Sequence, residues 1–216
     1  MKTYVREDPQ LAFNLPGDDV GQHERALNSN RRVLILAYSQ IKTPDGSLPT
    51  RGPVAIPALL SYDGLLWQTL RAIHPHVRKT HVAFLSAHHG FRRAEVHIRD
   101  YGERLTPEIA ARLIAAGVNT NWPPDARRWN SFAIAEISMM GASKKKPILD
   151  VALVSGKLYL EVMRSFVAEF QRWRLISPSA RVTEINGPIG LMHKGLRAWV
   201  QYPPARSKFE ELVTVS

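Results

Sequence analysis

Three short polar clusters, each following an apolar run, carry residue types that could bind or act on a polar ligand. They are Tyr38-Ser39-Gln40 with Lys42, Ser86-Ala87-His88-His89-Gly90, and Ser155-Gly156-Lys157 with Tyr159. The carboxyl ends of parallel strands meet at one edge of a sheet, so these distant clusters would line one crevice. The predicted substrate pocket therefore contains Tyr38, Ser39, Gln40, Ser86, Tyr101, Gly156 and Tyr159.

The histidines of the second cluster could support electrostatic or acid–base chemistry. His88 and His89 would donate hydrogen bonds in a pocket, or simply pack against neighbours. A serine–histidine couple with Ser86 is disfavoured, because successive side chains of an extended segment point to opposite sides. A histidine metal site is also disfavoured, since no i, i+4 histidine pair lies on a predicted helix with a carboxylate. We expect no metal and no cofactor.

The carboxylates expected nearest the crevice are Asp100, Glu103 and Asp150. Asp150 interrupts an apolar strand, where burial of its charge would require a partner. The alternative is an edge strand from which Asp150 faces water. The predicted catalytic residues are Asp100, Asp150, His88 and His89. Gly156-Lys157 lacks the earlier glycine of a phosphate-binding loop, although a helix amino end there could still hold one phosphate oxygen.

The net charge favours a polyanionic partner. The chain has 29 Lys and Arg residues against 19 Asp and Glu, and residues 1–29 sum to −2, which leaves +12 for the rest. Nucleic acid is the commonest such partner, although a basic surface can also be inert. Trp122, in a loop before two prolines, is a candidate for base stacking. The predicted DNA contacts are Lys42, Arg92, Arg93, Arg127, Arg128, Lys144, Lys145, Lys146, Arg172 and Arg174.

The elements that must position these residues alternate between strand and helix. The sequence predicts strands over 33–37, 81–86, 148–154 and 181–185, and helices over 56–73, 107–117, 125–141, 157–173 and 189–200. This alternation predicts a single three-layer α/β domain with a mostly parallel central sheet of about four or more strands. The domain spans 30–201, between an acidic N-terminal arm (1–29) and a C-terminal tail (202–216).

The composition also bears on location. No apolar run approaches the roughly 20 residues that cross a membrane. The chain contains no cysteine, which suits a reducing compartment. We therefore expect a cytoplasmic protein that does not contact membranes.

The order of the motifs resembles that of the YaaA-like proteins associated with peroxide stress. It is still more similar to a related uncharacterised domain of bacterial and phage genomes. The resemblance covers roughly 33–200 and departs from the family pattern at Ser39-Gln40-Ile41 and at His88-His89. The matching positions are Ser39 and Lys42; Leu85 to Gly90 with Tyr101; Gly156 and Tyr159; and Gly187-Pro188-Ile189-Gly190 before Leu196 and Trp199.

The resemblance implies a three-layer α/β fold, DNA association and kinship with enzymes of the uracil-DNA glycosylase type. Such an enzyme flips a nucleotide from the stack and releases its base. A carboxylate (Asp100, Glu103 or Asp150) would stabilise the sugar cation, and His88 or His89 would support the departing base. Tyr38, Tyr101 and Tyr159 would wall in the base.

We therefore expect a glycosylase-like enzyme that excises a modified or damaged base from DNA. Its substrate would be double-stranded DNA with a flipped base, or single-stranded DNA. The setting would be phage–host conflict, DNA protection or repair. Two alternatives remain open: a non-catalytic protein that binds and protects DNA, and an enzyme that processes nucleotides.

Overall fold

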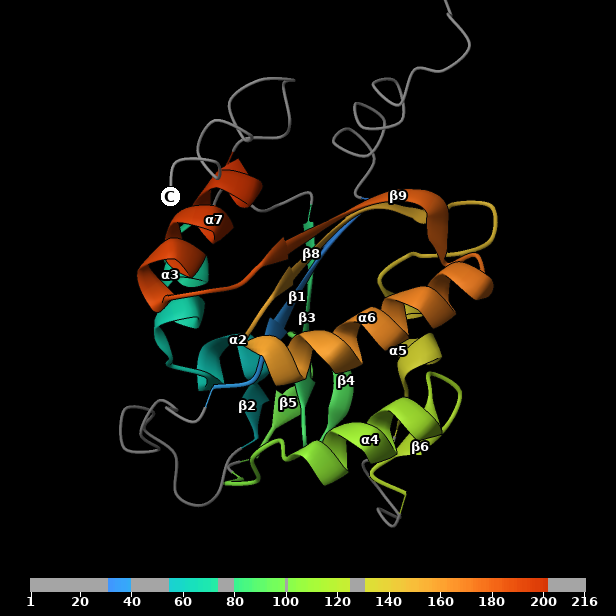
Figure 1. The fold of residues 1–216 in the computed structure, drawn as a ribbon, viewed down its shortest axis with the longest axis horizontal. Coiled ribbons are helices and arrows are strands. Elements are labelled where there is room, and N and C mark those ends of the chain that lie inside the picture. Colours follow the sequence, from blue (N-terminus) through green and yellow to red (C-terminus); the bar gives the residue numbers. More distant parts are fainter. Residues whose placement is uncertain (1–30, 40–54, 74–79, 100, 125–130, 202–216) are drawn as a thin grey trace, which may run out of the picture.

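The computed structural model describes residues 31–39, 55–73, 80–99, 101–124 and 131–201. In these ranges the chain forms an α/β fold, with six helices around a five-stranded sheet (Figure 1). The acidic arm and the C-terminal tail lie outside the described residues. So do five residues predicted to belong to the site: Gln40, Lys42, Asp100, Arg127 and Arg128.

The five-stranded sheet has the order β4-β3-β1-β8-β9. Four strands are parallel, and only the edge strand β4 runs antiparallel to its neighbour β3. The mostly parallel sheet expected from the alternation of elements is therefore confirmed. The strands are β1 (Arg32–Ala37), β3 (Thr80–Ser86), β4 (Gly90–Arg93), β8 (Ile148–Val154) and β9 (Ile176–Ile185).

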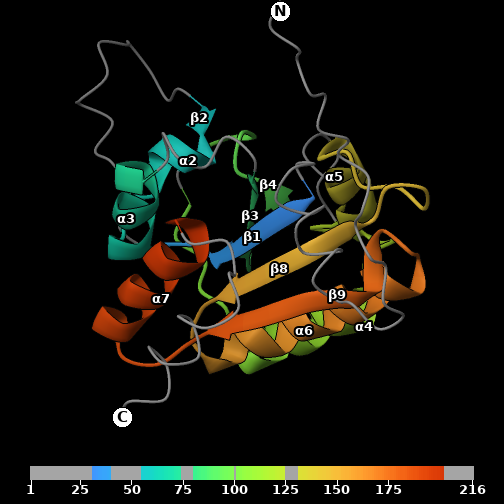
Figure 2. The same cartoon turned by 90° about the horizontal axis from the view of Figure 1, so that it is seen from above.

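Helices pack on both faces of this sheet, because alternate residues of each buried strand point to opposite sides. Val33 and Ile35 belong to the cluster formed with α4 (Pro107–Ala116), α5 (Ala133–Met139) and α6 (Lys157–Arg172). Leu34 and Leu36 belong to a second cluster, with α2 (Ala58–Ser61), α3 (Leu65–Ile73) and α7 (Ile189–Gln201). Figure 2 shows α3 and α7 on one side of the strands and α4 and α6 on the other.

Local sequence signals explain where several helices begin and break. Thr106 caps α4 by accepting a hydrogen bond from the Ile109 N–H at 3.3 Å, with Pro107 at the first helical position. The single helix predicted over 56–73 is wrong, because the chain forms a short strand, then α2, and then α3 after Gly64. A Cβ at Gly64 would lie 2.3 Å from Ser39 Oγ, so this break lets the backbone approach the end of β1.

Tertiary pairing added strands that the pattern did not indicate. The sequence predicts no strand directly after Gly90, but this segment forms β4 against β3. The last strand starts at Ile176 rather than near Arg181. Two small ladders complete the fold: β2 (Ile56–Pro57) with β5 (His97–Ile98), and β6 (Asn121–Trp122) with β7 (Ser131–Phe132). Among the described residues, no helix is long and apolar enough to cross a membrane.

Candidate active site at the carboxyl edge of the sheet

The carboxyl ends of three parallel strands bring the predicted polar clusters to one edge of the sheet. The Tyr38 N–H donates to the Leu85 carbonyl at 2.9 Å, which places the end of β1 beside the end of β3. On the other side of β1, Leu36 pairs with Val154, so the turn at Ser155 begins next to Ala37. We call this edge the carboxyl rim, formed by Tyr38-Ser39, Ser86–Gly90, Tyr101–Glu103 and Ser155–Tyr159.

Four tyrosines form a connected wall at the carboxyl rim. The Tyr38 ring stacks on Tyr101 with centroids 5.5 Å apart, and it contacts the rings of Tyr62 at 6.0 Å and Tyr159 at 6.4 Å. The hydroxyls of Tyr62 and Tyr101 are hydrogen-bonded to each other. Tyr62 is fully buried, and the sequence did not predict that it belongs to the site. The dipeptide Asp63-Gly64 beside Tyr62 is typical of turns, and it is the signal that could have indicated a break in the helix predicted over 56–73.

Burial keeps two of these tyrosines protonated. It raises the pKa of Tyr62 well above its usual value, and the neighbouring Tyr101 raises it further. Burial also raises the pKa of Tyr159, with added contributions from Tyr38 and Tyr101. The nearby backbone of Leu105 partly opposes this shift. Neither phenol can therefore act as a phenolate base at neutral pH, and the fully buried Tyr62 contributes to the packing of the tyrosine wall.

The turn after β3 presents a histidine paired with a carboxylate. The His88 ring stacks on Tyr101 with centroids 4.8 Å apart, and its Nδ1 lies 3.1 Å from Glu103 Oε2. The His88 and Glu103 side chains are 44% and 46% exposed, so both can reach a ligand. A carboxylate at Nδ1 orients the ring and leaves Nε2 to accept or donate a proton. His89 packs edge-on against Tyr101, with centroids 4.7 Å apart.

Other residues of the second cluster shape the turn itself. The buried Ser86 hydroxyl accepts a hydrogen bond from the His89 N–H at 2.8 Å, so it caps the turn rather than facing a ligand. Gly90 has φ +64°, and a Cβ there would approach Trp122 to 3.0 Å. The Trp122 Nε1–H donates to the Ala87 carbonyl at 2.8 Å. Trp122 is only 8% exposed, so it packs against the turn inside the protein and is unsuited to stacking on a base.

The first turn of α6 adds polar groups to the carboxyl rim. The Ser155 hydroxyl is buried and has no hydrogen-bond partner within the described ranges, and the same holds for the Tyr159 hydroxyl. Gly156, at the N-cap of α6, is exposed and has no side chain to satisfy the first backbone N–H groups. Such N–H groups and the helix dipole favour an electron-rich ligand atom. These groups could therefore hydrogen-bond a ligand at the carboxyl rim.

Two predicted DNA contacts are engaged inside the protein. Arg92 Nη1 lies 3.3 Å from Glu136 Oε1, and Arg93 Nε lies 3.1 Å from Glu136 Oε2. Burial lowers the pKa of Arg92, and Glu136 counteracts this shift. Glu136 comes from α5, which packs against β4. Arg92 and Arg93 thus fasten the edge strand to a helix, and the geometry gives little support to phosphate binding by them.

Asp150 lies near the amino end of β8, away from the carboxyl rim. Its Oδ2 accepts from Arg32 Nε at 2.9 Å, and its Oδ1 accepts from Arg181 Nε at 2.9 Å. Burial lowers the pKa of Arg32, and Asp150 opposes this shift. The alternative of an exposed edge strand is wrong, because Asp150 is 2% exposed and β8 has a neighbour on each side. Asp150 therefore ties three strands together and is not brought near His88.

The remaining predicted DNA contacts stand at the opposite edge of the sheet. Lys144, Lys145 and Lys146 are exposed and directly precede β8. Arg172 and Arg174 are exposed at the far end of α6, which begins at the carboxyl rim and runs back along the sheet (Figure 1). The structure thus separates these five cations from the histidine and tyrosine side chains of the carboxyl rim.

Comparisons with known proteins add no assignment. No protein-family model, curated protein or solved structure matches the chain. Within the described ranges, no group of three or more histidine, aspartate or glutamate side chains is placed to hold a metal ion.

Proposed function

We propose that the chain is a DNA-binding, glycosylase-like enzyme whose carboxyl rim grips a modified or damaged base. The observation that supports this most is the His88–Glu103 pair stacked on the Tyr101 face of the tyrosine wall. An aromatic wall beside hydrogen-bonding groups suits a planar heterocycle, which base-excising enzymes must hold outside the stack. We further propose that the chain is distantly related to YaaA-like and uracil-DNA glycosylase-type proteins. We also propose that its fold has three layers, with the sheet between two layers of helices, and that the protein is cytoplasmic.

The proposed reaction breaks the bond between the sugar C1′ and the base nitrogen. The electron pair of that bond leaves with the base, and a water oxygen bonds to C1′. One water proton is released, and the departing base is neutralised by a proton. Protonated His88 would stabilise the departing base and could supply that proton, while Glu103 holds the ring in place.

A second candidate is an enzyme that processes free nucleosides or nucleotides at the same rim. The placement of the cations favours it. Arg92 and Arg93 are paired with Glu136, and five exposed cations lie at the other edge of the sheet. The described part of the carboxyl rim therefore offers an aromatic surface with few cations to contact phosphates.

The test is to incubate the protein with oligonucleotides that contain uracil or oxidised pyrimidines, and in parallel with the matching nucleosides. Chromatography would measure free base, and alkali treatment would reveal abasic sites. We expect His88→Ala to lower the rate of base release by about 10²–10⁴-fold, the usual contribution of a general acid or base. Glu103→Gln should lower it less, because Glu103 acts through His88.

The matched control is Glu95→Gln, which removes an exposed carboxylate after β4 and outside the carboxyl rim. It should leave the rate unchanged. Release from nucleosides alone would favour the second candidate. Absence of release from every substrate would contradict both enzymatic proposals and leave DNA binding without catalysis. Full activity in His88→Ala would contradict the role assigned to His88.

A further inference from the structure

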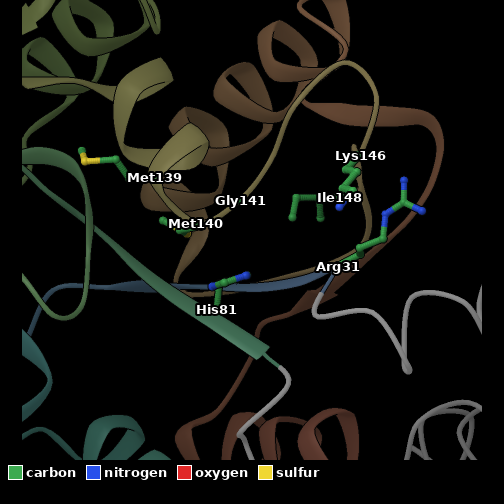
Figure 3. A pocket seen from close by; sticks show the side chains of 7 residues that line it. All are labelled: Arg31, His81, Met139, Met140, Gly141, Lys146 and Ile148. Atoms are coloured by element: carbon green, nitrogen blue, oxygen red, sulfur yellow. The ribbon is translucent and has the colours of Figure 1, made fainter.

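A cavity of about 500 Å³ lies at the amino edge of the sheet, opposite the carboxyl rim. Arg31 precedes β1, His81 lies near the start of β3, and Ile148 opens β8, so three adjacent parallel strands contribute to it. Its volume lies within the range of about 300–1,000 Å³ typical of small-molecule sites. The lining residues, drawn in Figure 3, are Arg31, His81, Met139, Met140, Gly141, Lys146 and Ile148.

The polar side of the cavity is basic. Its lining contains an arginine, a lysine and a histidine, and no carboxylate. Asp150, the acidic residue nearest in sequence to Ile148, is already paired with Arg32 and Arg181. A compensating anion is therefore absent among the lining residues, and the cavity attracts negatively charged ligands.

Arg31 is held in place by the loop that precedes β8. Its Nε donates to the Pro147 carbonyl at 2.8 Å, and its own carbonyl accepts from the Leu149 N–H at 2.9 Å. Its two terminal amino groups have no hydrogen-bond partner in the part of the chain that the structure describes. A guanidinium presented in this way can bind a phosphate with two parallel hydrogen bonds.

Lys146 projects from a closed turn. The Lys146 N–H donates to the Ser143 carbonyl at 3.0 Å and to Ser143 Oγ at 3.1 Å, and the Ser143 N–H donates to the Lys146 carbonyl at 3.1 Å. These bonds fix the backbone that carries Lys146. Lys144 and Lys145 belong to the same exposed turn but do not line the cavity. They are therefore matched controls for Lys146.

The other side of the cavity is apolar. Met139 and Met140 line it, and Met139 is 54% exposed. In the view of Figure 3 the two methionines lie to one side and the arginine and lysine to the other, with His81 between them. Methionine is flexible and polarisable, and it contacts the edges and faces of flat aromatic groups favourably. The cavity thus joins a cationic end to an adaptable apolar end.

We propose that this cavity binds an organic phosphate that carries a flat apolar group, the chemistry of a nucleotide. The phosphate would lie against Arg31 and Lys146, and the heterocycle against Met139 and Met140. Inorganic phosphate would leave the methionines uncovered, and a purely apolar ligand would leave the cations unmatched. A free mononucleotide and a DNA strand share this chemistry. The site is separate from the carboxyl rim and does not depend on the function proposed there.

The test is calorimetric titration of the full chain with adenosine monophosphate, with adenosine and inorganic phosphate as partial probes. We expect adenosine monophosphate to bind more tightly than either part. Lys146→Ala and Arg31→Ala should each weaken binding by about tenfold or more, the effect of losing one charged hydrogen bond. Lys144→Ala and Lys145→Ala should change the affinity by less than about twofold, as expected of exposed charges.

Further arms separate the two sources of the phosphate and the two edges of the sheet. Displacement of adenosine monophosphate by a single-stranded oligonucleotide would show that DNA occupies the cavity, and failure to displace it would indicate a free nucleotide. A loss of affinity in His88→Ala would show that adenosine monophosphate binds at the carboxyl rim instead and would contradict the proposal. If Arg31→Ala folds poorly, the affinity of Lys146→Ala for adenosine monophosphate tests the proposal, because Lys146 is exposed. No measurable binding of adenosine monophosphate, or equal losses in the Lys144 and Lys146 variants, would overturn the proposal.

Discussion

The two edges of the sheet use similar residue types in different ways. At the carboxyl rim, Glu103 is half-exposed and pairs with a half-exposed His88. At the amino edge, Asp150 is buried between Arg32 and Arg181. An exposed carboxylate–imidazole pair can exchange protons with a ligand. A buried carboxylate held by two arginines instead joins the strands that carry them. The carboxyl rim thus suits planar ligands and proton chemistry, and the amino edge suits anions.

The largest expected effect comes from breaking the buried triad of Asp150, Arg32 and Arg181 at the amino edge. Asp150→Asn leaves Arg32, whose side chain is 5% exposed, without its charge partner. We expect the free energy of unfolding to fall by about 3–5 kcal/mol, because an uncompensated charge stays buried. Urea denaturation would measure the loss. Base release per folded molecule should be unchanged, since Asp150 is remote from His88.

Glu184→Gln is the matched control for Asp150→Asn. It removes an ion pair between β9 and α6, with Arg164, but this pair is exposed. Solvent screening makes its contribution small, so its loss should be a minor fraction of that in Asp150→Asn. Equal losses in the two variants would contradict the distinction between the buried triad and the surface pair.

The next largest effect concerns the turn that carries His88. Gly90→Ala would place a Cβ at φ +64° and 3.0 Å from Trp122. We expect a loss of about 1–3 kcal/mol in the free energy of unfolding, from backbone strain and the displaced tryptophan. Base release should fall with it, whereas binding of adenosine monophosphate should not. Denaturation followed by tryptophan fluorescence would measure the stability.

The control for Gly90→Ala is Gly187→Ala, where φ is +122° but nothing lies within 4 Å of the added Cβ. This variant reports strain without the clash. A loss equal to that of Gly90→Ala would mean that contact with Trp122 is unimportant for the turn.

The smallest effect appears only at high pH. Burial raises the pKa of Tyr62 and Tyr159, so the folded protein retains protons that the unfolded chain releases above about pH 10. The contribution of these tyrosines to stability is complete below that pH and is lost as the pH rises toward their folded values. Phenolate absorbance would follow the ionisation of the tyrosines, and urea denaturation at increasing pH would follow the free energy of unfolding. Tyr62→Phe should make the free energy of unfolding fall less steeply with pH. Ionisation of all six tyrosines in one step without unfolding would contradict it.

Much of the fold could be predicted from local patterns. The apolar runs at 33–37, 81–86 and 148–154 are parallel strands, and their carboxyl ends meet as expected. The edge strand β4 was missed because Arg92 and Arg93 make its sequence look like a solvated loop. Their charges are compensated by Glu136, which lies on another element. No local signal reports a partner so far along the chain.

The sequence by itself determined the alternation of strands and helices, and with it the edge at which His88, Tyr101 and Tyr159 gather. That result depends on hydrophobic periodicity and chain direction, which are local properties. Only the tertiary structure decided the role of each charge. The sequence predicts both Glu103 and Asp150 near the crevice, but Asp150 is buried between the arginines of two neighbouring strands, whereas Glu103 is half-exposed beside His88. The cost of burying a charge depends on groups distant in the chain, and these meet only when the protein folds.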